Sequence, residues 1–180
     1  MYGQFGSALT GIIAVTTNGT LLTVRYPEAG NFLLRVKRMH VQVTTLTAFG
    51  TPVTAGRGLK LVRASNDAAA TANPLGGAAF TFGRTRSGRG GTLAIGHVAT
   101  TGALTTTGFT FESAVIQRMQ LVHAGASGAN WDEVWRWNET EAQPIYLEPG
   151  WLVGLQTEAA LDATGTIQVQ AEIDAEEVYK

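Results

Sequence analysis

The side chains in this chain that are best suited to catalysis or metal binding are its three histidines, which lie far apart in the sequence. They are His40, His97 and His123, they share no metal-ligand spacing, and the chain has no cysteine to complete a site. No serine lies in the Gly-x-Ser-x-Gly turn that presents a catalytic nucleophile in many hydrolases. We therefore expect no catalytic residue, no metal site and no cofactor.

Acidic residues gather in one region of the chain that also holds tryptophans. They are Asp132, Glu133, Glu139, Glu141 and Glu148. A glycosidase needs two carboxylates that face each other across a sugar-binding cleft. These carboxylates lie among turn residues, which favours a solvated face, so the sequence predicts a protein that is not an enzyme.

Three tryptophans alternate along one short segment. Trp131, Trp135 and Trp137 share one strand parity, while Asp132, Val134 and Arg136 take the other. Three indoles on one face carry a large apolar area. The favoured interpretation is core packing, the next is contact with a partner protein, and the third is a stacking platform for carbohydrate.

Three arginines lie in a glycine-rich segment that reads Gly-Arg-Thr-Arg-Ser-Gly-Arg-Gly-Gly. They are Arg84, Arg86 and Arg89. Such a loop suits a solvated hairpin tip or a docking site for acidic groups of another protein. No aromatic residues are interleaved with the arginines, and the phosphate-loop pattern is absent, so we expect no direct binding of nucleic acid.

The composition bounds the class of protein. The chain has 180 residues, a net charge of −1 and 15% charged residues, where about 25% is typical. Its size suits one domain, and its low charge suits a β protein that buries surface against neighbours. No segment approaches the roughly 18 apolar residues of a membrane-spanning helix. The first residues also lack the basic start of a signal peptide, so we expect a soluble protein made in a cytoplasm.

Alternation of apolar and polar residues is the main structural signal. From Ile167 to Asp174 it has no error, which predicts a strand with one dry face and one wet face. The turn residues from Asp162 to Gly165 predict that this strand closes a terminal antiparallel hairpin. Eight to ten short strands separated by turns predict an all-β sandwich or barrel.

The first half of the chain gives three further predictions. Asn18-Gly19 lies between two apolar runs and predicts another hairpin. The run from Phe32 to Thr47 has mixed alternation, which predicts a bulge or a crossing between sheets. Residues 1–11 predict an N-terminal arm that is ordered against a partner, so residues 1–19 form the arm and first short strand and residues 20–180 form one sandwich domain.

Several segments resemble those of small virion proteins of tailed bacteriophages. The closest is Leu147-Glu148-Pro149-Gly150-Trp151-Leu152-Val153, followed by Gly165-Thr166 and an alternating last strand. The others are Arg35-Val36-Lys37-Arg38, the strand from Gly58 to Ala64, and Pro74-Leu75-Gly76-Gly77. In these pieces, which cover about two thirds of the chain, it is similar to the jelly-roll capsid decoration, or cement, proteins and related minor structural components.

The resemblance implies an antiparallel jelly-roll sandwich at the virion surface. Its expected partner is the major capsid protein, and its expected state is a homo-oligomer, either a trimer or a dimer, away from any membrane. Hypothesised contact residues are Tyr2, Phe5, Arg84, Arg86, Arg89, Trp131, Trp135 and Trp137. A neck, tail or fibre-base protein and a carbohydrate-binding sandwich module remain as alternatives.

Overall fold

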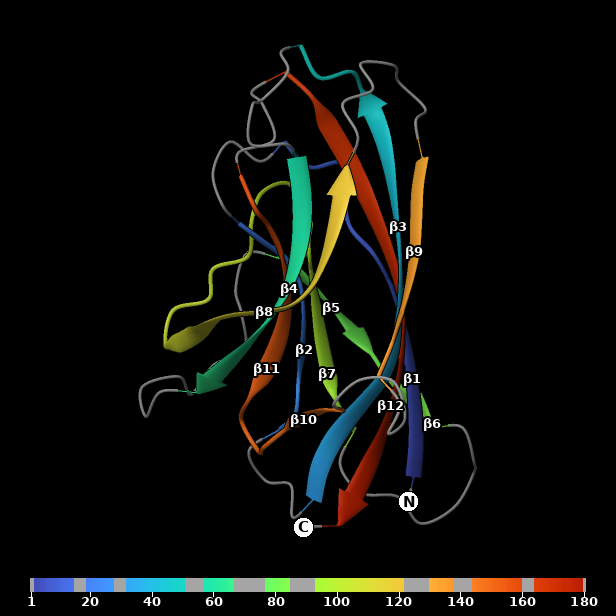
Figure 1. Ribbon diagram of the computed structural model, residues 1–180, viewed down its shortest axis with the longest axis vertical. Coiled ribbons are helices and arrows are strands. Elements are labelled where there is room, and N and C mark those ends of the chain that lie inside the picture. The colour runs from blue at the N-terminus through green and yellow to red at the C-terminus, as the bar shows by residue number, and fades with distance from the viewer. Residues whose placement is uncertain are drawn as a thin grey trace.

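Every element in the described part of the chain is a β-strand. Figure 1 shows the computed structural model, which describes residues 2–14, 19–27, 32–50, 57–66, 77–84, 93–121, 130–137, 144–159 and 164–179. These residues form β1 (Tyr2–Leu9), β2 (Thr20–Arg25), β3 (Phe32–Thr47), β4 (Arg57–Asn66), β5 (Gly77–Thr81), β6 (Gly83–Arg84), β7 (Ile95–Ala99), β8 (Phe109–Leu121), β9 (Asn130–Arg136), β10 (Ile145–Leu147), β11 (Leu152–Thr157) and β12 (Thr166–Tyr179).

The strands form two antiparallel sheets that pack against each other (Figure 1). In the first, called sheet A, the order is β10-β3-β12-β1-β6, and β9 pairs with β3 beyond the stretch that β10 uses. In the second, called sheet B, the order is β5-β7-β2-β11-β4-β8. The prediction of an all-β sandwich is confirmed.

The connectivity is that of a jelly roll. β1 pairs with β12, β2 with β11, β3 with β9 and β10, and β4 with β8. These pairs are nested in the sequence and alternate between the two sheets, as in a long hairpin rolled into two layers. The inserted strands β5 and β7 extend sheet B beyond β2, and β6 extends sheet A beyond β1.

Both predicted hairpins are wrong. β11 pairs with β2 and β4 in sheet B, whereas β12 pairs with β1 and β3 in sheet A, so the chain between them crosses from one sheet to the other. Asn18 lies outside the described residues, but Ile13 bridges Ile167 while β2 pairs with β7 and β11, so the chain crosses there as well. Alternation identifies the dry face of a strand and says nothing about its partner strand.

The predicted N-terminal arm is also wrong, because β1 is an interior strand of sheet A. It pairs with β12 from Tyr2 to Leu9 and with β6 on its other side. Gln4 and Ala8 share the strand parity that faces inward and are buried, and the Gln4 side chain accepts a hydrogen bond of 2.8 Å from the Ala94 amide. Because β1 pairs with β12 along its whole length and buries one side, this segment is part of the sandwich domain.

The bulge predicted in the run from Phe32 to Thr47 is confirmed. Along β3, the register with β12 skips Lys37 and Leu46. Val36 therefore faces the core before the first irregularity and Met39 faces it after, which explains the mixed alternation.

The inner faces of the two sheets share one main hydrophobic core. Near one end of this core, the hydroxyl of the fully buried Tyr26 donates a 3.1 Å hydrogen bond to Glu177 Oε1. Burial, and then the charge of Glu177, raise the pKa of Tyr26 to about 12. Since Tyr26 follows β2 and Glu177 lies on β12, this bond joins the two sheets.

Candidate functional site

Three apolar side chains are exposed along the outer side of β1 and the residues just after it. Phe5 and Leu9 have the parity of β1 that points away from the core and are 50% and 56% exposed, and Ile12 is 59% exposed. We call Phe5, Leu9 and Ile12 the apolar strip. Single exposed apolar residues are ordinary, but three large ones within eight residues of the chain indicate a contact surface.

The apolar strip adjoins the start of the arginine-rich segment. β6 pairs with β1, which places Phe5 opposite Gly83 and Gln4 opposite Arg84. A Cβ atom at Gly83 would lie 2.8 Å from Phe5 Cζ, so the glycine leaves room for the aromatic ring to lie across β6. Two of the predicted contact residues, Phe5 and Arg84, are thus brought together at this edge of sheet A.

Other predicted contact residues are not placed by the structure. Arg86 and Arg89 lie outside the described residues, and for Tyr2 the structure describes the backbone within β1. Their predicted role stays a prediction.

A charged network covers the outer face of sheet A beside the apolar strip. Arg38 binds Asp174 at 3.0 Å and Glu172 at 3.5 Å. His40 contacts Glu172 at 3.5 Å through Nδ1 and Asp132 through Nε2, so it links β12 to β9 across β3. Such exposed pairs add little stability, but they fix the pattern of charge that a partner meets.

The tryptophans follow the core interpretation for two of the three positions. Trp135 and Trp137 are each 4% exposed, and their rings pack edge to face with centroids 6.4 Å apart. Trp135 Nε1 donates a 2.7 Å hydrogen bond to Glu133, which satisfies the buried indole. Trp131 is half-buried against the same core. Trp135 and Trp137 therefore do not offer a free surface to a protein partner.

Asp132 and Glu133, two of the carboxylates considered for glycosidase chemistry, do not face one another. Asp132 points outward to His40, whereas Glu133 has the opposite parity and binds Trp135. Glu139 and Glu141 lie outside the described residues.

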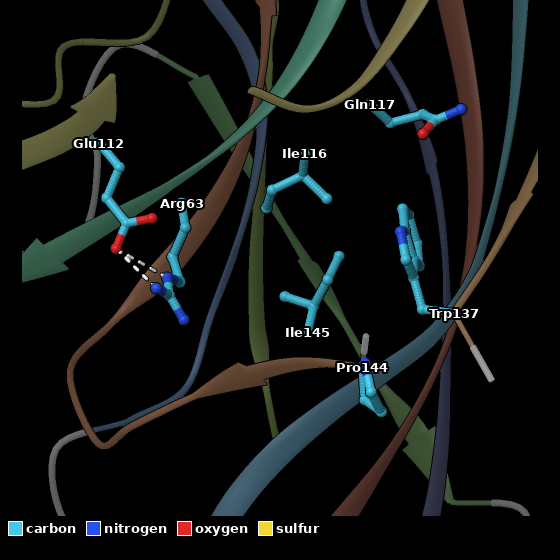
Figure 2. A pocket seen from close by; sticks show the side chains of 7 residues that line it. All are labelled: Arg63, Glu112, Ile116, Gln117, Trp137, Pro144 and Ile145. Atoms are coloured by element: carbon cyan, nitrogen blue, oxygen red, sulfur yellow. Dashed lines mark hydrogen bonds and ion pairs between the residues drawn. The ribbon is translucent and has the colours of Figure 1, made fainter. Parts of the chain in front are cut away.

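A pocket of about 340 Å³ opens where the edges of the two sheets face each other (Figure 2). β8 contributes Glu112, Ile116 and Gln117, and β4 contributes Arg63. Trp137, Pro144 and Ile145 line it from the side of sheet A. Figure 2 shows the ion pair between Arg63 and Glu112 to one side of the apolar residues, with an Nη2–Oε1 distance of 2.8 Å. Its volume lies near the lower end of the range of small-molecule sites.

The two described histidines do not share a site. His40 lies on the outer face of sheet A, whereas His97 is buried on β7 of sheet B. Burial, and then the positive charge of Arg25, lower the pKa of His97. Within the described residues, no group of three or more histidine or acidic side chains has an arrangement that fits a metal ion. His123 lies outside them.

Sequence reasoning missed three exposed apolar residues and the pocket. Leu9 fell within the predicted arm of residues 1–11, and Ile12 fell within the short apolar run just after it, so the sequence assigned no strand parity to either residue. Val134 is 43% exposed, and its signal was available, because it is an apolar residue on the wet parity of its strand, between Asp132 and Arg136. The pocket depends on β4, β8 and β10 meeting in space, and no local pattern contains that information.

Comparison with known proteins adds no family assignment. No protein-family model matches the chain, and no curated protein matches it in sequence. Among the described residues, no helix has the length and apolar character needed to cross a membrane.

Proposed function

We propose that this chain is a virion structural protein that binds and stabilises a bacteriophage capsid, as cement or decoration proteins do. Its partner in this proposal is the major capsid protein, and it binds the outer surface of the shell as a homo-oligomer. The apolar strip of Phe5, Leu9 and Ile12 carries the proposal, because an apolar row beside a charged network suits a protein contact. The jelly-roll fold, the low charge and the resemblance to phage decoration proteins support it.

The contact surface is assigned to the outer face of sheet A around β1. Phe5 lies over Gly83, so its ring is held in place before binding. A preordered aromatic side chain loses little conformational entropy when a partner covers it. Many copies of one modest contact on a symmetric shell reach high total strength through multivalency.

The test measures decoration of purified expanded capsids that lack this protein. We expect Phe5→Ser with Leu9→Ser to weaken binding at least about tenfold, since buried aromatic and aliphatic anchors carry most of the energy of an interface. The matched control is Leu46→Ser, which removes an apolar residue exposed elsewhere on sheet A. Deletion of residues 1–11 does not serve as a test, because it removes an interior strand.

Cosedimentation and copy number per particle are the measurements, with circular dichroism to check the fold. Wild-type occupancy by a folded Phe5→Ser, Leu9→Ser variant would refute the assigned contact. Failure of the wild-type protein to bind shells would refute the function itself.

Copy number also separates the capsid proposal from the neck, tail or fibre-base alternative. Hundreds of copies per particle fit a decoration protein, and six or twelve fit a tail component. The carbohydrate-binding alternative requires an exposed indole face, which Trp135 and Trp137 do not offer.

A further inference from the structure

β9 is a regular strand at the edge of sheet A. It pairs with β3 from Asn130 to Arg136 without a register shift, and no other described strand pairs with it. The other edge strands of the described sheets are shorter or irregular. β6 has two residues, β10 has three, β5 has five, and β8 has register shifts against β4. Short or bulged edges discourage pairing with another chain, and β9 lacks both devices.

The backbone of β9 presents hydrogen-bonding groups along its free edge. The Trp137 amide donates a 2.8 Å hydrogen bond to the Lys37 carbonyl, so residues of this parity direct their backbone groups toward β3. In an antiparallel pair this pattern alternates from one residue to the next. The N–H and C=O groups of Asp132, Val134 and Arg136 therefore point away from β3.

The side chains of these same three residues lie on the outer face. Val134 lies between the other two and is 43% exposed. Arg136 is exposed, makes no ion pair within the described residues, and lies opposite Arg38 on β3. Like charges directly opposite each other are unfavourable, so a carboxylate beside Arg136 would be stabilising.

We propose that β9 pairs antiparallel with β9 of a second copy of this chain about a two-fold axis at Val134. In this register each Val134 faces its counterpart, and each Asp132 faces the Arg136 of the other copy. The interface is isologous, as expected for a symmetric dimer. Two equivalent charge pairs then flank one apolar contact.

The charges on β9 select this register over its neighbours. A two-fold axis at Asp132 would bring two carboxylates together, and an axis at Arg136 would bring two guanidinium groups together. An axis at Glu133 would leave Asp132 opposite Val134, without a cationic partner. The axis at Val134 places each carboxylate opposite a guanidinium group, and opposite charges at facing positions favour the pair.

The β9 pairing also determines how the two copies would meet a capsid, a point that rests on the proposed function. A two-fold axis between antiparallel strands runs perpendicular to the sheet, so both outer faces lie on the same side of the dimer. The two apolar strips then face a shell together. Binding of one strip raises the effective concentration of the other, so the dimer binds more tightly than a single copy.

The first test is a charge exchange on the full chain, read by analytical ultracentrifugation without capsids. Because every substitution acts twice in a symmetric dimer, we expect Asp132→Arg or Arg136→Asp to weaken dimerisation about tenfold. The double variant Asp132→Arg, Arg136→Asp restores opposite charges and should recover most of the affinity. Circular dichroism checks that each variant is folded.

The second test uses the absence of native cysteine. Facing residues of a hydrogen-bonded antiparallel pair have Cα atoms about 5.5 Å apart, which is within the range of a disulfide. Val134→Cys should therefore form a covalent dimer on mild oxidation, whereas Ser7→Cys, exposed on β1, should not. Mixing Asp132→Cys protein with Arg136→Cys protein should crosslink far more than either protein alone.

Three results would overturn the inference. They are a wild-type monomer up to about millimolar concentration, a trimer, or crosslinking that does not depend on the position of the cysteine. A monomer would direct attention to a different chain as the occupant of the β9 edge. None of these results bears on whether the apolar strip binds shells, because Phe5→Ser with Leu9→Ser leaves β9 unchanged.

Discussion

Replacement of Tyr26 by Phe tests the bond that joins the two sheets. The variant keeps the buried ring and removes the hydroxyl, which donates a 3.1 Å hydrogen bond to Glu177. Glu177 is 2% exposed, so the change leaves a buried carboxylate without its donor. Hydrogen bonds to charged groups contribute about 1.5–3 kcal/mol, so we expect Tyr26→Phe to lower the free energy of unfolding at pH 7 by about 2 kcal/mol.

The raised pKa of Tyr26 also predicts how the free energy of unfolding changes with pH. The pKa of Tyr26 rises from 10.0 to about 12 in the folded protein. Between these values the unfolded chain has released the phenolic proton and the folded protein retains it, so stability falls as pH rises. The contribution is complete below pH 10 and declines by about 1.4 kcal/mol per pH unit, or about 3 kcal/mol in total.

Guanidinium chloride unfolding followed by far-UV circular dichroism, from pH 7 to pH 11.5, measures both effects. Other groups titrate in the same range, so the quantity of interest is the difference between the wild type and Tyr26→Phe. The matched control is Tyr179→Phe, which removes a hydroxyl from a side chain that is 81% exposed. If Tyr26→Phe loses as much stability above pH 10 as the wild type does, the reasoning about this buried pair is wrong.

Two further predictions concern other buried positions. Gly96→Ala should destabilise the fold by about 1–3 kcal/mol in chemical unfolding, because the added Cβ would lie 2.0 Å from the Phe80 ring; Gly102→Ala, with no atom within 4 Å, should have little effect. The lowered pKa of His97 means that the unfolded state binds more protons just below pH 6.5, so stability should fall as pH decreases through that range. His97→Gln should reduce this acid dependence, and an unchanged dependence would contradict the assignment to burial and the charge of Arg25.

The sequence predicted which face of a strand is buried better than it predicted which strands pair. The alternation from Ile167 to Asp174 identified which side chains of β12 are buried, and mixed alternation identified the irregularity in β3. The shared parity of Trp131, Trp135 and Trp137 was also a correct indication of an inward face. These features depend on the pleat of a single strand, so a local pattern contains them.

Pairing failed as a prediction because it is decided between segments far apart in the chain. A turn signal such as Asn18-Gly19 reports that the chain changes direction, and it serves a crossing between sheets as well as a hairpin. The same limit applies to residues 1–11, where glycines and few charges resemble a free terminus. No alternation of apolar and polar residues marks β1, because its inward residue Gln4 is polar whereas its outward residues Phe5 and Leu9 are apolar.

The position of β12 has a consequence for how the protein is made. This strand lies between β1 and β3, yet it is the last of the twelve described strands to leave the ribosome. Sheet A therefore lacks the strand between β1 and β3 until translation has passed Tyr179. Until then, the backbone edges of β1 and β3 that pair with β12 stay unpaired. Nascent chains stalled before β12 should be sensitive to protease and dependent on chaperones, since strand pairing across such a long separation is slow and leaves aggregation-prone edges open.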